Sequence, residues 1–143
     1  MHYLTDKDLQ DTISKFLERY GISGLKQALQ SYDNMQQKYL CKSKTSVSKI
    51  RLRDIYYLEI TGHHITVHTE HETYKKYGAL NRELEYLSPY GFVKCNQSCI
   101  VSLQKIRSIL GNDIILINHE HLYLSRHYAS KVLIAFSHNH LPN

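Results

Sequence analysis

Tryptophan is absent from this sequence of 143 residues, and proline and cysteine are scarce, with two and three residues respectively. An odd number of cysteines without paired Cys-x-x-Cys motifs predicts neither a disulfide framework nor a zinc module, so a reducing cytoplasm is the expected location. No apolar run reaches about eighteen residues, and we therefore expect no membrane-spanning helix. The N-terminus lacks the basic and then apolar order of a secretory signal.

Glycine is also sparse, and its six residues are too dispersed to form a phosphate-binding loop. No pattern places a nucleophilic serine or cysteine beside a histidine and an orienting acid, so we expect no enzymatic activity. Histidine is more frequent, with ten residues, and four of them fall within nine positions: His63, His64, His68 and His71. Neighbouring histidines at a hairpin tip point in different directions, so we expect no metal ion and no other cofactor. A histidine-rich metal sensor is an alternative, which the metal content of the purified protein tests.

Positive charge is concentrated in the second part of the chain, within a total net charge of +5. Residues 1–37 carry four Lys/Arg and five Asp/Glu, whereas residues 38–143 carry fourteen and eight. A basic excess confined to one part favours a polyanionic partner such as nucleic acid. The alternative is that the charge only keeps the protein in solution.

Residues 1–41 predict a helical N-terminal extension. Thr5 is suited to cap a first helix, whose opening turns are rich in aspartate. Gly21 predicts the end of this helix, and a second helix follows, with apolar residues at spacings of three and four up to Tyr39. Two short helices cannot bury both of their apolar stripes alone. The apolar stripes are therefore covered either by the rest of the chain or by a second copy in a homodimer.

Two segments predict irregular structure. Residues 42–49 are rich in serine and lysine and poor in apolar side chains, as in a linker. Residues 138–143 form a polar tail. Residues 50–137, which lie between these segments, are the expected globular domain.

The expected domain is built mostly from strands, because apolar and polar residues alternate through much of it. A short helix is expected at residues 79–87, and a last helix from about 126 to 136, with Ser125 at its start. The predicted fold is therefore mostly β with short helices, preceded by an N-terminal helical pair.

Three predicted turns carry side chains that can reach base edges and phosphates. They are residues 62–64, residues 96–98 after Lys94, and residues 125–127 at the start of the last helix. Asparagine and glutamine amides pair with adenine, and histidine or arginine can donate to guanine. Lysine, serine and the first backbone N–H groups of a helix suit phosphates. If the three turns lie on one side of a rigid frame, they form a DNA-reading surface; otherwise they are solvated polar turns.

At these segments the chain resembles the LytTR family of bacterial DNA-binding domains. The matching stretches are residues 50–59, 78–80, 92–102 and 124–128, together with Leu84, Leu87 and Ile106. Their order and spacing agree with the family from about residue 45 to residue 137. The resemblance implies stacked small β-sheets whose loops enter successive major grooves of promoter DNA. It also implies binding to direct repeats as a dimer.

The resemblance also implies roles for individual residues. Base contacts fall on His63, Gln97 and His127. Positions at the DNA backbone or beside a base-contacting residue fall on a second set: His64, Lys94, Asn96, Ser98 and Arg126. The sequence departs from the family at Asn96, where histidine is usual, at Ser102, where asparagine is usual, and at His127, where a second arginine is usual. These departures leave the operator sequence open.

Residues 1–41 are too few for the phospho-receiver domain of many relatives, which implies a stand-alone regulator. We therefore predict a cytoplasmic, sequence-specific transcription regulator that binds double-stranded DNA as a homodimer. The alternative is an anti-regulator that sequesters a related transcription factor through residues 1–41. Deleting these residues discriminates between the two hypotheses.

Overall fold

The computed structural model describes residues 4–139, and their contacts divide the chain into a helical segment up to Asn34 and a β domain from Met35 onward. Each unit is described by itself. The predicted polar tail falls largely outside the described residues, since the last helix continues to His138.

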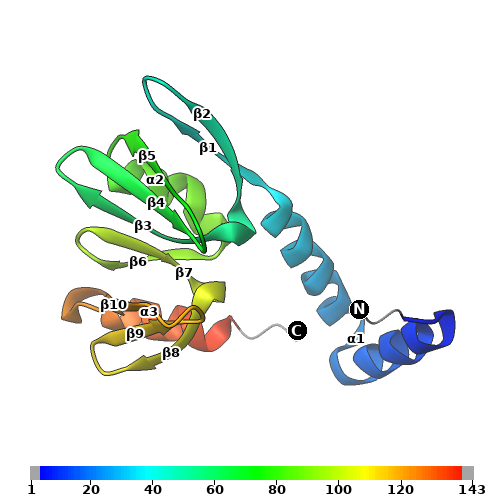
Figure 1. Cartoon of the computed structure of the whole chain (residues 1–143). Helices are drawn as coiled ribbons and strands as arrows, with labels where there is room; N and C mark the ends of the chain where they lie inside the picture. The colour runs from blue at the N-terminus through cyan, green and yellow to red at the C-terminus, as the bar shows by residue number, and fades with distance from the viewer. Residues whose placement is uncertain (1–3, 140–143) are drawn as a thin grey trace. The chain divides into compact units, whose positions relative to one another are not determined.

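The helical segment is a single run, α1 (Asp6–Gln36), interrupted by non-helical backbone at Gly21, where φ is 72° and ψ is −176°. This kink separates two helices, as predicted (Figure 1). At the start, the Asp8 amide donates to Thr5 Oγ1 at 3.0 Å and the Thr5 amide donates to Asp8 Oδ2 at 3.3 Å, which confirms the predicted cap.

The prediction of a linker at residues 42–49 is wrong. These residues belong to a β-hairpin, in which β1 (Lys38–Lys42) pairs antiparallel with β2 (Val47–Arg51). The Ser43 amide donates to the Ser46 carbonyl at 2.9 Å and closes the turn. The helical extension therefore ends before residue 41, and Tyr39, which was expected on the second helical stripe, is a buried strand residue. Its spacing from the apolar residues before it fits a helix, but the pattern from residue 38 has the period of a strand.

The main sheet of the β domain has five antiparallel strands in the order β5-β4-β3-β7-β6. Its strands are β3 (Ile55–Thr61), β4 (His64–Thr69), β5 (Thr73–Tyr77), β6 (Phe92–Asn96) and β7 (Cys99–Ser102). The pairing of β3 with β7 joins two hairpins that are distant in the sequence. This pairing decides where the turns of both hairpins lie.

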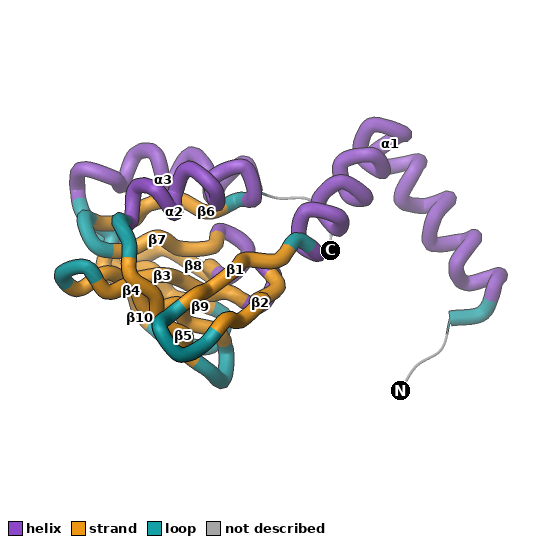
Figure 2. The backbone as a smooth tube through the Cα atoms, turned by 90° about the horizontal axis from the view of Figure 1, so that it is seen from above, coloured by secondary structure: helices purple, strands orange, loops and turns teal. Residues whose placement is uncertain are grey.

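A smaller sheet consists of β8 (Ile106–Leu110), β9 (Asp113–Leu116) and β10 (His121–Tyr123). Two helices, α2 (Leu80–Leu87) and α3 (Arg126–His138), both lie beside β6 (Figure 2). Short 3-10 helices connect several strands, among them η3 (Leu103–Lys105) after β7. The predicted fold of small sheets and short helices after a helical segment is confirmed.

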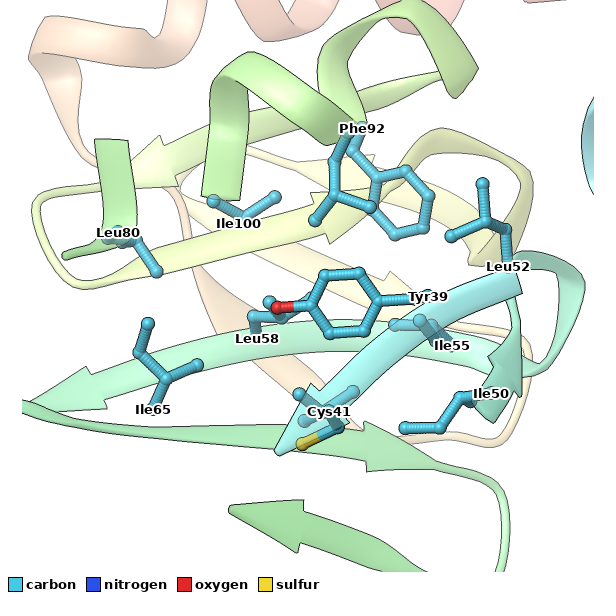
Figure 3. Packing of buried hydrophobic residues seen from close by; sticks show 12 residues of the cluster. Tyr39, Cys41, Ile50, Leu52, Ile55, Leu58, Ile65, Leu80, Phe92 and Ile100 are labelled. Carbon is cyan, nitrogen blue, oxygen red and sulfur yellow. The ribbon is translucent and has the colours of Figure 1, made fainter. Parts of the chain in front are cut away.

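Two hydrophobic cores occupy the β domain. The first lies between the β1–β2 hairpin, the main sheet and α2, and includes Tyr39, Leu58 and Phe92 (Figure 3). The second lies between the main sheet, the smaller sheet and α3, and includes Cys95, Leu116 and Val132. Strand β3 is buried from Ile55 to Leu58 and contributes to both cores. The three cysteines are free and buried, as the sequence predicts.

A buried polar cluster fastens the β1–β2 hairpin to the rest of the domain. Glu83 is only 8% exposed. Its carboxylate accepts hydrogen bonds from the Tyr39 hydroxyl and from Lys76 Nζ, the latter at 2.7 Å. Lys76 Nζ also lies 4.9 Å from the centre of the Tyr39 ring. Burial, and then the hydrogen bond to Glu83, raise the pKa of the Tyr39 phenol. The cluster thus joins β1 to β5 and α2.

We expect Tyr39→Phe to lower the free energy of unfolding by about 1.5–3 kcal/mol, because it removes a hydrogen bond to a buried carboxylate. Urea denaturation measures the change. Tyr77→Phe is the control. Tyr77 is 61% exposed, so this variant should change the free energy of unfolding by no more than about 0.5 kcal/mol. Equal losses in the two variants would show that the buried cluster does not fasten the hairpin.

Candidate nucleic-acid interface

The register of the main sheet brings two of the predicted polar turns to one end. Strand β3 leads into the turn at residues 62–63, and the opposite strand β7 begins at Cys99, which pairs with Glu59. The Ile60 amide donates to the Ser98 carbonyl at 2.9 Å, which extends the contact to the second turn. The start of α3 lies at the same side of the domain, on the left of Figure 1. We call residues 62–64, 96–98 and 125–127 the polar edge.

The first segment of the polar edge is the turn between β3 and β4. Gly62 adopts a φ of 64°, which favours glycine at this position. The exposed imidazole of His63 makes no hydrogen bond or ring contact with the other described residues, while the carbonyl of His63 accepts from the Gly78 amide at 3.1 Å. The ring of His64 is packed 4.3 Å from the Tyr77 ring. His63 is therefore the freer of the two histidines.

The second segment is the turn between β6 and β7, and Asn96 holds it in place. Asn96 Nδ2 donates to the Tyr123 carbonyl at 2.9 Å, and Asn96 Oδ1 accepts from the amide and the hydroxyl of Ser98 at 2.9 and 3.1 Å. These bonds engage both ends of the Asn96 amide within the protein. Asn96 and Ser98 therefore hold the turn that carries Gln97, and the position beside DNA that the resemblance implies for them stays a prediction.

Gln97, at the tip of this turn, is exposed and has a different role. Its Oε1 accepts a hydrogen bond from the Tyr128 hydroxyl at 3.0 Å, and its Nε2 has no partner among the described residues. An amide oxygen accepts a second hydrogen bond, so both polar atoms of Gln97 can meet another molecule. Tyr128 thus orients Gln97, a role that no signal in the sequence indicated.

The third segment begins at Ser125, whose amide donates to the Cys95 carbonyl at 3.0 Å and ties α3 to β6. Ser125 occupies the N-cap position with extended backbone, but its hydroxyl forms no capping hydrogen bond, contrary to expectation. Arg126 and His127 are exposed, and the His127 ring meets the Tyr128 ring edge-on at 4.8 Å. Tyr128 therefore contacts both the second and the third segment.

Lys94 lies behind the polar edge and is half-buried. Its Nζ donates to Asn81 Oδ1 at 3.0 Å and lies 5.6 Å from the centre of the Tyr128 ring. The ammonium group is thus engaged by α2 and α3, close to the residue that orients Gln97. The sequence offered no signal for its contact with Asn81.

The histidines do not form a common cluster. His68 Nε2 lies 2.7 Å from Glu59 Oε1, and the His68 ring is stacked on the Tyr57 ring at 4.1 Å. Within residues 4–139, no three His, Cys, Asp or Glu side chains are grouped closely enough to hold a metal ion. In the same part of the chain, no helix combines the length and the apolar character that crossing a bilayer requires.

Comparison with known families identifies the kind of domain that carries the polar edge. Residues 45–136 match the LytTr DNA-binding domain. The chain belongs to the LytTR family. This is a family of DNA-binding domains rather than of enzymes, and the match covers all three segments of the polar edge.

A solved LytTR structure supports the same assignment. It is the LytTr DNA-binding domain of a protein described as a putative methyl-accepting/DNA response regulator from Bacillus cereus. The two chains are 26% identical, with a TM-score of 0.57 over 68% of this chain and 96% of that chain. The search of curated proteins gave no match. The LytTR match begins in the turn of the β1–β2 hairpin, so β1 and the helical segment precede it.

The contacts of the LytTR domain predict that substitutions of two neighbouring side chains change the free energy of unfolding by different amounts. Asn96→Ala should lower the free energy of unfolding by about 1–3 kcal/mol, because it leaves the Tyr123 carbonyl and the Ser98 amide without their partner. Gln97→Ala should change it by no more than about 0.5 kcal/mol, since Gln97 is exposed. Urea denaturation of both variants measures the difference. An Asn96→Ala protein as stable as the wild type would contradict the positioning role.

Proposed function

We propose that this protein regulates transcription by sequence-specific binding to duplex DNA, with the polar edge facing the major groove. The observation that carries the proposal is the antiparallel pairing of β3 with β7, which presents His63 and Gln97 at one end of a rigid sheet. The start of α3 adds His127 to the same side. Bacterial promoters are cytoplasmic, so this is where we place the protein.

Base recognition is assigned to the side chains of the polar edge that the fold leaves available. Gln97 can donate through Nε2 and accept through Oε1, the pattern that adenine complements. His63 and His127 can donate to guanine acceptors. Contacts with phosphates are assigned to Arg126, His64 and the first backbone N–H groups of α3. Lys94 adds positive charge behind Gln97, although its Nζ is already engaged by Asn81.

We propose that two copies bind neighbouring direct repeats and that the helical segment holds them together. Among the described residues, no buried hydrophobic side chain precedes Tyr39, while Leu9, Ile13, Leu29 and Tyr32 on α1 are each more than 40% exposed. A helical pair of this length with exposed apolar stripes is stabilised mainly by a partner. The same exposed stripes favour the second candidate function, an anti-regulator that captures a related transcription factor.

Substitution of Gln97 tests the base-reading role. In a binding-site selection from random duplexes, Gln97→Ala should lose about 1–3 kcal/mol of discrimination at one operator position, or roughly 5- to 150-fold in relative affinity. Gln104→Ala is the matched control, because Gln104 is exposed in η3, at the opposite end of β7. If Gln97→Ala keeps the base preferences of the wild type, Gln97 does not read the operator.

Removal of residues 1–34 separates the two candidate functions. The β domain contains both hydrophobic cores, so we expect the shortened protein to fold and to bind a single repeat specifically. Sedimentation equilibrium should show a dimer for the full chain and a monomer for the shortened one. A shortened protein without specific DNA binding, combined with helices that still bind a related factor, would favour the anti-regulator.

A further inference from the structure

We propose that the outer face of the β1–β2 hairpin is a second DNA-binding surface, which contacts phosphates of the duplex that flanks the bases read by the polar edge. The inference rests on the proposed function and adds to it a sequence-independent contact. Strand β1 and Lys44 precede residues 45–136, which match the LytTR family.

The net positive charge of the β domain comes from this hairpin and the two residues that follow it. Residues 38–53 contain no Asp or Glu but carry six basic residues: Lys38, Lys42, Lys44, Lys49, Arg51 and Arg53. Residues 54–143 carry eight Lys/Arg and eight Asp/Glu, so their formal charge is zero with histidine neutral. The excess positive charge of the β domain therefore lies outside the polar edge.

The strand period places the basic residues of the two strands on one face of the hairpin. In both strands the exposed positions alternate with the less exposed ones, and the exposed positions of the two strands pair across the hairpin. Lys38 lies opposite Arg51, Leu40 opposite Lys49, and Lys42 opposite Val47. Like charges directly opposite one another destabilise a hairpin. An anion bound over the outer face would relieve the repulsion between Lys38 and Arg51.

The lysines of this face are available for such a ligand. Arg51 Nε lies 3.4 Å from Asp54 Oδ2, but Lys38, Lys42, Lys44 and Lys49 form no ion pair with any described residue. The turn adds hydroxyl groups, since Ser43 Oγ and Ser46 Oγ lie 2.8 Å apart and both residues are exposed. Ammonium and hydroxyl groups are typical phosphate ligands.

The inner face holds the outer face rigid. Tyr39, Cys41 and Ile50 are each less than 5% exposed and belong to the first core. Tyr39 is bonded to Glu83, and the Tyr86 hydroxyl donates to the Lys38 carbonyl at 3.0 Å. A surface that is already ordered binds with little loss of conformational entropy.

The hairpin also packs against β5, the strand that adjoins the first segment of the polar edge. Cys41 Sγ donates to the Lys75 carbonyl at 3.5 Å, which places β1 against β5, the edge strand beside β4. The order across the domain is therefore hairpin, β5, β4, β3, β7, β6 and then α3. Figure 1 shows the hairpin on one side of the main sheet and the smaller sheet on the other. A duplex that follows the polar edge beyond His63 reaches the hairpin.

The test compares two triple variants of the full chain with equal loss of charge. The first is Lys38→Gln, Lys42→Gln and Lys49→Gln on the hairpin. The second is Lys7→Gln, Lys15→Gln and Lys26→Gln on α1. The probes are a duplex cut to the bases that the wild type selects and the same duplex extended on both sides by about ten base pairs, one helical turn. Anisotropy titrations at several salt concentrations give the affinity for each probe.

The wild type should bind the extended duplex about tenfold more tightly than the short one, and the hairpin variant should lose this advantage. On the extended duplex, the slope of log K against log salt should become shallower by about 0.9 for each phosphate that a lysine no longer neutralises, or about 2–3 in total. The selected bases should not change, and the free energy of unfolding should not fall, because Lys38→Gln removes the repulsion with Arg51. The α1 variant, and a hairpin variant with three Lys→Arg substitutions, should behave like the wild type.

Two outcomes would overturn the inference while the proposed function stands. In one, the wild type binds its selected duplex and the hairpin variant has the same affinity and salt slope. In the other, both Lys→Gln variants lose affinity equally, which would indicate only the overall charge of the protein. A wild type that selects no duplex sequence would overturn the proposed function and this inference together.

Discussion

The antiparallel pairing of β3 with β7 is the interaction on which the arrangement of the domain depends. Without it, the β3–β4–β5 strands and the β6–β7 hairpin would be separate units, and their turns would have no fixed relation. The register Leu58 opposite Ile100 also divides the apolar residues of β3 between two cores. A slip by one residue would exchange the two faces of the strand and direct the side chains of each core into the other, so the cores and the turn positions are specified together.

The polar edge shows a division between side chains that hold the fold and side chains that remain free. Asn96 directs both ends of its amide into the protein, and Ser98 joins it, while Gln97 between them keeps an Nε2 without a partner among the described residues. His63 and His64 are divided in a similar way, since only His64 packs on a neighbouring ring. Side chains that are free in this sense can change during evolution of a new operator preference without loss of stability, because the fold does not use them.

Much of the architecture could be predicted from local signals. Thr5 and Gly21 mark the two ends of the first helix, and the strand period with its turn residues locates most hairpins. The β1–β2 hairpin was missed although its residues have the period of a strand, because Tyr39 also fits the helical spacing before it and its partner Glu83 is distant in the sequence. The segments of the polar edge were predictable, but the bond from Tyr128 to Gln97 was not, since it depends on how α3 packs against β6.

Most of the excess positive charge of this domain lies away from the polar edge. The groups proposed to read bases are accompanied by few free cations, because Lys94 is bound to Asn81 and only Arg126 carries a fixed positive charge without a partner among the described residues of the edge. Affinity for DNA depends mainly on the number of phosphates that cations neutralise. From residue 54 onward the formal charge of the domain is zero, so the excess of cations in the β domain comes from the β1–β2 hairpin and the residues just after it. On this argument the buried bond between Tyr39 and Glu83 would serve binding as well as stability, since it fixes the lysines of the outer face relative to the side chains proposed to read the bases.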